Sequence, residues 1–260
     1  HMAADRIARK HTLIQIPMIH RKGCAELLPH RHLPALLESH LQWNRPRRMI
    51  AGNENQAVRI SLPHAVHKGE NRPIRIPVGP HDLLLVIDLQ NVYTEGQPWA
   101  CCHIRQAARN IRRLLDAGVC GEVLFTRFVP PAQPEGMWRE YNRVNAAVNA
   151  DAFANAMLPE MAPYLERYPL LDKSVYSSFS IPKVREAAAR ADRVVVTGVV
   201  AECCVLSTVL AGIDLGHRMV YMTDAVAGVT PESEAQAEAI VSYLTVPHTE
   251  VLTTGAYLEQ

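Results

Sequence analysis

Four reactive side chains stand at the ends of apolar segments of this sequence: Asp88, Lys173 and the adjacent thiols of Cys203 and Cys204. A thiol at the start of a helix and beside a lysine tends towards the nucleophilic thiolate, because both neighbours lower its pKa. An aspartate can take the thiol proton and later return it to a leaving amine. Together these groups suit acyl transfer from an amide better than phosphoryl or hydride transfer.

Each of these residues alone also has an ordinary structural explanation. An aspartate after a strand often caps the next loop, a lysine is usually solvated, and a buried cysteine usually serves as inert packing. The chemical interpretation therefore depends on whether the three residue types meet in the folded chain.

The order of the apolar segments predicts that they do meet. Six runs are typical of strands, at 83–87, 121–126, 170–173, 193–198, 219–224 and 246–253. Helical spacing occurs at 104–115, 184–191 and 205–213, and another helix starts at Thr230 and Pro231, with Ala237, Ile240, Val241 and Leu244 as its expected buried face. This alternation predicts an α/β fold with a parallel sheet and helices on both faces. Ligands bind at the carboxyl ends of such strands, which places the three residue types at one crevice.

The chain divides near residue 81. Residues 1–81 form a Pro- and His-rich extension with 13 Lys/Arg against 5 Asp/Glu, whereas 82–260, the expected enzyme domain, holds 14 against 21. The extension reads as irregular, with one helix near 33–43 and short edge strands at 57–62 and 74–78. A basic arm can bind nucleic acid. Its charges are scattered and almost no aromatics lie between them, so we favour a solvated or interface-forming extension.

Composition excludes several classes of protein. No apolar run approaches the roughly 18 residues that span a membrane, and the start lacks the zones of a signal peptide. Six cysteines without regular spacing give no disulfide framework, and no CxxC, HxxxH or HExxH motif indicates a metal. His1 and Met2 look like a cloning remnant. We expect a cytoplasmic protein without cofactor or metal, and no binding to membranes.

Four stretches of the chain resemble the isochorismatase-like cysteine hydrolases. They are DLLLVIDLQNVY (82–93), DKSVYSSF (172–179), VTGVVAECCVLSTVLAG (196–212) and DAVAG (224–228). The resemblance implies a Rossmann-like three-layer α/β/α sandwich. It also implies a catalytic triad of Asp88, Lys173 and Cys204, in which Cys204 is the nucleophile and Cys203 faces the core and is dispensable.

The same resemblance implies further features of the site. Such proteins usually carry a non-proline cis peptide before the nucleophile loop, here expected between Val200 and Ala201. The backbone N–H groups of Ala201 and Cys204 would then form the oxyanion hole. Members are commonly dimers or tetramers, so we expect a homo-oligomer.

Departures from the family pattern reduce the number of activities that the resemblance allows. Metal-dependent nicotinamidases carry an Asp-x-His site and a further histidine, but no histidine follows FTRF (125–128), and His103 reads as a lone solvated residue. Isochorismatases that cleave a vinyl ether lack the nucleophilic cysteine. The expected reaction is hydrolysis of a small amide, ureido or carbamoyl compound through a thioester, with release of ammonia or an amine.

The substrate-binding residues are less closely defined by the sequence. Arg127 either pairs with a substrate carboxylate through its planar fork or forms a surface salt bridge. Aromatic residues in nearby connections, namely Trp99, Phe128, Trp138, Tyr141, Tyr176 and Phe179, either line a pocket or belong to the core.

Two other readings remain open. The same fold could open a lactam or cleave an ether. Alternatively, the chain could be a catalytically idle relative whose basic extension binds a partner, although the intact Asp88, Lys173 and Cys204 weigh against this.

Overall fold

The computed structural model describes residues 81–245 and 247–260. Apart from His81, the expected extension lies outside the described residues, as do the helix and edge strands expected within it.

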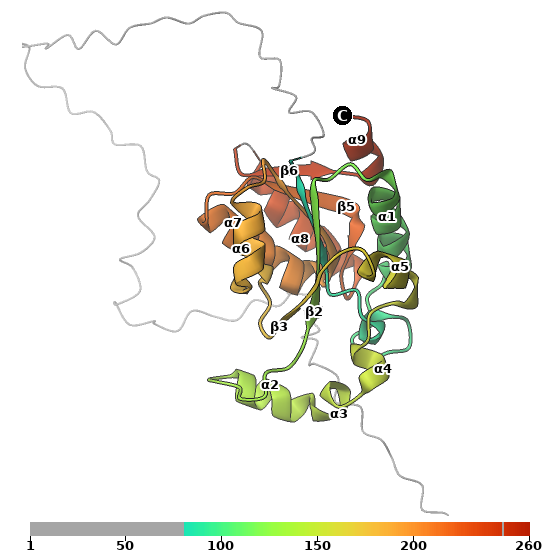
Figure 1. The fold of residues 1–260 in the computed structure, drawn as a ribbon. Helices are drawn as coiled ribbons and strands as arrows, with labels where there is room; N and C mark the ends of the chain where they lie inside the picture. The colour runs from blue at the N-terminus through green and yellow to red at the C-terminus, as the bar shows by residue number, and fades with distance from the viewer. Residues whose placement is uncertain (1–80, 246) are drawn as a thin grey trace, which may run out of the picture. The chain divides into compact units, whose positions relative to one another are not determined.

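A six-stranded sheet forms the centre of the described part (Figure 1). Its strands are β1 (Leu83–Ile87), β2 (Glu122–Phe128), β3 (Leu170–Lys173), β4 (Val194–Val199), β5 (Met219–Ala227) and β6 (Thr249–Leu252). All neighbours pair in parallel, in the order β3-β2-β1-β4-β5-β6. The chain reverses its direction of progress across the sheet between β1 and β4, and ligands of open α/β sheets bind at such a point.

Strand β1 lies in the middle of this sheet and is inaccessible to solvent along its whole length. Its side chains alternate between two clusters: Leu84 and Val86 enter one, and Leu83, Leu85 and Ile87 enter the other. A strand covered on both faces needs a continuous apolar sequence, which explains the run at 83–87.

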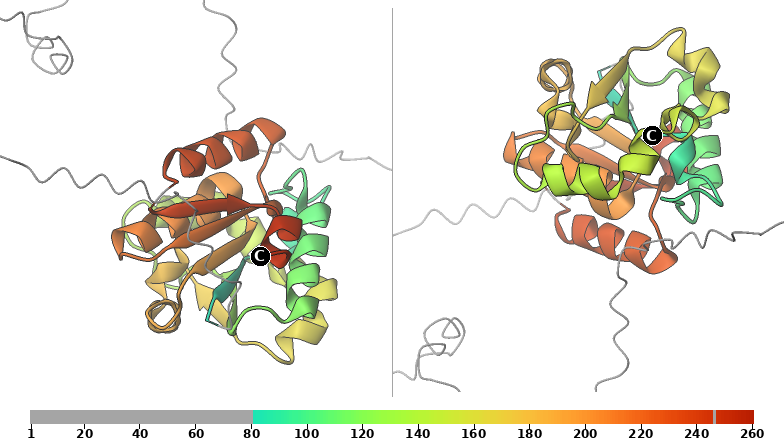
Figure 2. Two further views of the ribbon diagram at one scale, coloured as in Figure 1. Left: turned by 90° about the horizontal axis from the view of Figure 1, so that it is seen from above. Right: turned by 90° about the horizontal axis from the view of Figure 1, so that it is seen from below.

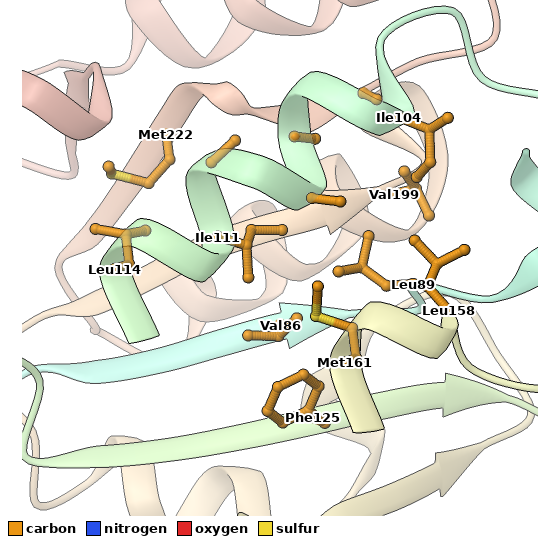
Figure 3. Close-up of a cluster of buried hydrophobic side chains, with 14 of the residues drawn as sticks. Val86, Leu89, Ile104, Ile111, Leu114, Phe125, Leu158, Met161, Val199 and Met222 are labelled. Carbon is orange, nitrogen blue, oxygen red and sulfur yellow. The ribbon is translucent and has the colours of Figure 1, made fainter. Parts of the chain in front are cut away.

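Helices cover both faces of the sheet, as Figures 1 and 2 show. One face packs against α1 (Ile104–Ala117), α5 (Ala162–Leu165) and α9 (Thr254–Leu258), and the other against α6 (Pro182–Ala188), α7 (Leu206–Asp214) and α8 (Pro231–Tyr243). Figure 3 shows the first interface, where Ile111 and Leu114 of α1 lie near Val86 and Met222. The predicted three-layer α/β/α architecture is confirmed.

Helix α8 begins as the sequence predicts but buries a narrower stripe. Thr230 and Ser233 form a reciprocal capping box, and Pro231 occupies the first turn. Ala237 and Val241, one turn apart, are buried, whereas Ile240 is 46% exposed, so its expected burial was wrong. The sheet therefore contacts only the i and i+4 row of this helix.

The connection between β2 and β3 contains short helices that the sequence did not indicate. They are α2 (Trp138–Val144), α3 (Ala146–Asn149) and α4 (Ala152–Asn155). Helices α2 and α3 contain no buried residue, and without an apolar stripe there was no periodic signal to read. Both lie beyond the carboxyl end of β2, as seen in Figure 1 and from below in Figure 2.

The amino end of the sheet carries a buried ion pair. Arg193, just before β4, donates from Nη2 to Asp82 Oδ2 at 2.7 Å and from Nε to both carboxylate oxygens at 3.2 Å. Tyr257 of α9 donates its hydroxyl to the same Oδ2 at 2.6 Å. Among the described residues, no helix has the length and apolarity needed to cross a membrane.

Candidate active site

Asp88 leaves the carboxyl end of β1 in an unusual conformation. Its φ is 52°, and its side chain is inaccessible to solvent. A left-handed backbone is uncommon outside glycine but is better tolerated by aspartate than by most residues. Thr126 of β2 donates its hydroxyl to Asp88 Oδ1 at 2.8 Å, and this contact fixes one carboxylate oxygen.

Lys173 is the last residue of β3, and its side chain extends past the end of β2 to reach the Asp88 carboxylate. Its Nζ lies 2.6 Å from Asp88 Oδ2, 3.3 Å from Cys204 Sγ and 3.2 Å from the Val175 carbonyl oxygen. Burial lowers the pKa of Lys173, but the charges of Asp88 and Cys204 outweigh that effect and raise it above its usual value. The lysine is therefore an ammonium fixed by an ion pair with Asp88 and by contacts with Val175 and Cys204.

Cys204 lies in a π-helical turn, η5 (Ala201–Val205), that joins β4 to α7. Its side chain is buried, and Thr208, one turn further along, donates its hydroxyl to the Cys204 carbonyl at 2.7 Å. The N–H groups of Cys203 and Val205 both donate to the Val200 carbonyl, at 3.0 and 3.1 Å. These bonds fix the turn that carries the thiol and so keep Cys204 Sγ within 3.3 Å of Lys173 Nζ.

The resting thiol differs from the sequence expectation. Burial, followed by the charge of Asp88, raises the pKa of Cys204 well above its usual value, and Lys173 only partly opposes this. Burial and the neighbouring Asp88 therefore favour the protonated thiol, in contrast to the expected thiolate.

The cis peptide lies one residue earlier than expected. It joins Val199, the last residue of β4, to Val200, and not Val200 to Ala201. The expectation was wrong because the chain leaves the strand directly after Val199. Just before it, Gly198 has a φ of 102°, and a Cβ there would lie 2.0 Å from the Ile87 carbonyl oxygen. Only glycine allows β4 to pass β1 this closely beside Asp88.

Aromatic rings gather beside this trio. Phe128, Trp138 and Tyr141 have ring centroids 5.2–6.3 Å apart, and Tyr176 lies 5.3 Å from Trp138. Lys173 Nζ lies 5.6 Å from the centre of the Phe128 ring. Four of the aromatic residues expected at the site are thus brought together. Trp99 joins them, and its ring lies 6.3 Å from that of Tyr141.

Two expected residues do not join the cluster. Arg127 donates from Nε and Nη2 to the two oxygens of Asp172, at 2.8 and 2.9 Å. Arg127 pairs in register with Asp172, and Phe128 with Lys173, so alternation puts Arg127 on the opposite face from Lys173. The proposed carboxylate contact of Arg127 is thus not supported; its fork forms the salt bridge. Phe179 stacks instead on His217, at 5.4 Å.

Sequence reasoning missed several groups that shape the site. Thr126, a polar residue that directly follows the apolar run at 123–125, carried a readable signal. Tyr93, whose ring lies 5.9 Å from that of Trp99, is buried in the short turn that follows Asp88. The Val175 carbonyl carries no signal in the sequence, because backbone groups look alike at every position.

Within residues 81–245 and 247–260, one other group of side chains has the donors for a metal ion: Cys102, His103 and Glu234. His103 Nδ1 lies 2.6 Å from Glu234 Oε2, and Cys102 Sγ lies 3.4 Å from the same nitrogen. A separation of 2.6 Å is a hydrogen bond and is shorter than two ligands of one ion usually lie apart. We therefore interpret this group as a hydrogen-bonded cluster, and His103 is not the lone solvated residue that the sequence suggested.

Comparison with known proteins agrees with this fold. A cysteine hydrolase from Pseudomonas syringae pv. phaseolicola 1448A superposes with a TM-score of 0.61 at 21% identity, over 71% of this chain and 94% of that one. An isochorismatase-like hydrolase from Alkaliphilus metalliredigens gives 0.55 at 18%, over 68% and 97%. A nicotinamidase from Bacillus subtilis gives 0.52 at 17%, over 66% and 99%. A search of curated proteins found no match.

Similarity at this level of identity shows the fold and leaves the reaction open, because one fold hosts many activities. The isochorismatase domain model matches residues 82–254, which is more than half of the chain and includes every residue of the buried trio. The resemblance seen in the four motifs is thus confirmed, and the chain belongs to the isochorismatase domain family.

Proposed function

We propose that this protein is a cysteine-dependent hydrolase of a small amide, ureido or carbamoyl compound, acting through a thioester and releasing ammonia or an amine. The observation that carries this proposal is the buried chain of contacts from Asp88 through Lys173 to Cys204, with separations of 2.6 and 3.3 Å. A nucleophile, a proton acceptor and a fixed cation stand there in one place.

Because burial raises the pKa of Cys204, the thiol needs a base at the moment of attack. In the proposed first step, Asp88 takes the proton of Cys204 as sulfur bonds to the substrate carbonyl carbon. The carbonyl π electrons move to oxygen and give a tetrahedral oxyanion. Lys173 keeps its charge throughout and offsets the negative charge passing between Asp88 and Cys204.

The oxyanion needs donors that are already in place. We assign this role to the backbone N–H groups of Ala201 and Cys204, because the neighbouring N–H groups of Cys203 and Val205 already donate to the Val200 carbonyl. Loss of one such donor typically costs about 3 kcal/mol of transition-state stabilisation. Ala201 contributes only backbone here, so its small side chain is compatible with the role.

Collapse of the intermediate breaks the C–N bond, and Asp88 returns its proton to the leaving nitrogen. A water molecule then attacks the thioester while Asp88 accepts one of its protons. The second tetrahedral intermediate expels Cys204, which recovers a proton from Asp88. One amide and one water thus give one acid and one amine, and the protein is unchanged.

The two adjacent cysteines allow a sharp test. Cys203 is partly buried and packs against the cluster beneath α1, whereas Cys204 packs in the cluster on the other face of the sheet. Ammonia release from a panel of small amides, ureas and carbamoyl compounds should be measured for wild type, Cys204→Ser and Cys203→Ser, with melting curves as folding controls.

The proposal expects turnover by wild type and Cys203→Ser and a loss of about 10³-fold or more in Cys204→Ser. Equal activity in all three proteins would refute the nucleophile. No turnover of any compound would instead favour a lactam- or ether-cleaving relative, or an idle one.

A further inference from the structure

Six aromatic rings from four segments surround the approach to the thiol. We call them the aromatic wall: Tyr93, Trp99, Phe128, Trp138, Tyr141 and Tyr176. Each ring has at least one neighbour in the wall, and the centroids of neighbouring rings lie 5.2–6.4 Å apart. Edge-to-face and tilted pairs of this kind form a rigid apolar surface.

The wall lies against the reacting groups. Burial raises the pKa of Tyr141, and the charges of Tyr176 and then Cys204 raise it further. Phe128 faces the Lys173 ammonium. Trp99, Trp138, Tyr141 and Tyr176 keep part of their surface exposed, so a group that enters from solvent meets these rings first.

Two cations near the wall, Lys173 and Arg127, are already held by partners. Lys173 has three N–H groups, and its three partners are Asp88, the Val175 carbonyl and Cys204. Arg127 is held in a two-point salt bridge on the other face of the sheet. Among the described residues, Lys173 is also the one cation that lowers the pKa of Tyr176, and none lowers that of Tyr141.

A substrate carboxylate would therefore be buried without a partner, which is costly, whereas a flat apolar group would gain contact area. Resting on the proposed function, we infer that the acyl group bound here is an uncharged ring, that the aromatic wall selects it, and that carboxylate-bearing carbamoyl compounds are rejected. Trp138 and Tyr141 make α2 the specificity element. Helix α2 buries no residue in the core, so it can vary without loss of the fold.

The direct test compares matched neutral and charged amides on the full-length protein. Benzamide, 4-methylbenzamide and 4-carbamoylbenzoate share a ring and differ in the para group, and acetamide lacks the ring. We expect kcat/KM for 4-carbamoylbenzoate to be about 10²-fold or more below that for 4-methylbenzamide, which controls for size. Equal or faster turnover of the carboxylate would overturn the inference.

Variants of the wall test the role of α2. Trp138→Leu and Tyr141→Leu should lower kcat/KM for the ring amides about tenfold more than for acetamide. Phe153→Leu is the matched control, because it removes a ring that is 61% exposed on α4 and outside the wall. An equal loss for ring amides and acetamide would contradict selection by the wall.

Binding separates this inference from the proposed function. Calorimetry on Cys204→Ser measures affinity for benzamide and 4-carbamoylbenzoate without turnover. If no amide is hydrolysed by wild type, the proposed hydrolysis fails, and preferential binding of benzamide still supports the wall. Equal affinity for the two compounds, or tighter binding of the carboxylate, overturns the wall whatever the activity.

Discussion

One buried aspartate lies directly before strand β1 and another directly after it, and these two aspartates have different hydrogen-bond and ion-pair partners. Asp82, before the strand, accepts hydrogen bonds from the Arg193 guanidinium and from the Tyr257 hydroxyl. Asp88, after the strand, has the Thr126 hydroxyl on one oxygen and the Lys173 ammonium on the other. Neither carboxylate is more than 1% exposed.

The chemistry of the partners separates the two ends. Arginine stays protonated and holds its fork in place, so the Asp82 pair can only fix geometry. Lysine at the other end bridges to a thiol, and the thiol can lose a proton. Burial of an ion pair is thus common to both ends, whereas a thiol in contact with the cation of the pair is found at the Asp88 end. We therefore expect changes at the amino end to alter stability and changes at the carboxyl end to alter turnover.

The largest effect is expected from Asp88→Asn. Removal of the proton acceptor should lower kcat about 10²- to 10⁴-fold, as is usual for loss of a general acid–base group. Steady-state ammonia release on protein shown to be folded by circular dichroism would measure it. Activity within threefold of wild type would contradict the role of Asp88.

Asp82→Asn, the same substitution at the other end, should act on folding. Removing one partner of a buried ion pair costs about 3–5 kcal/mol, and we expect the lower end of that range because Arg193 keeps its 3.2 Å contact with Glu250. Urea unfolding should show this loss, with kcat of the folded protein unchanged. A drop in kcat as large as that of Asp88→Asn would erase the distinction between the two ends.

A smaller effect is expected from Thr126→Val. It removes the hydrogen bond to Asp88 Oδ1, and hydrogen bonds to charged groups are worth about 1.5–3 kcal/mol, or roughly 10- to 100-fold in rate. Thr197→Val is the matched control, because the Thr197 hydroxyl is equally buried and donates to the Leu85 carbonyl at 2.9 Å. Rates should fall in the first variant only; a parallel fall in both would point to a general packing effect.

The smallest expected effect is a pH dependence of stability. Because burial raises the pKa of Cys204, the native thiol keeps a proton that the unfolded chain loses above about pH 8.5. The stabilisation is complete below that pH and declines as pH rises, by at most about 1.4 kcal/mol per pH unit.

Urea unfolding at pH 8 and pH 10 measures this slope. Cys204→Ser should show a flatter decline than wild type, and Thr197→Val, which removes no ionisable group, should keep the wild-type slope. A steeper decline in Cys204→Ser would show that the native thiol is already ionised.

Much of the fold could be predicted from the sequence, because buried segments need characteristic patterns of apolar residues. Strand β1 occupies the predicted residues 83–87, since a doubly covered strand must be apolar throughout. Helix α8 starts at its predicted cap, because Thr230 and Pro231 act locally. Helix α2 has no such pattern, since none of its residues is buried and its aromatic side chains meet the sheet at Phe128, the last residue of β2.

The sequence predicted which site residues lie at the ends of strands, but it did not predict the register in which neighbouring strands pair. Strand order alone brings Asp88 and Cys204 to neighbouring strands, β1 and β4. The fate of Arg127 depended on its register against Asp172, and no pattern within either segment specifies that pairing. The raised pKa of Cys204 depended on the depth of burial, which follows from the packing of η5 against the sheet.

The central claim is that Cys204 carries the acyl group, and mass spectrometry of the quenched reaction tests it most directly. The best substrate of the amide panel would be mixed with wild type and Cys203→Ser, stopped with acid within one turnover, and the protein digested. The account predicts the acyl mass on the peptide that contains Cys204 in both proteins. An acyl group on any other residue, or turnover that persists in Cys204→Ser, would contradict it.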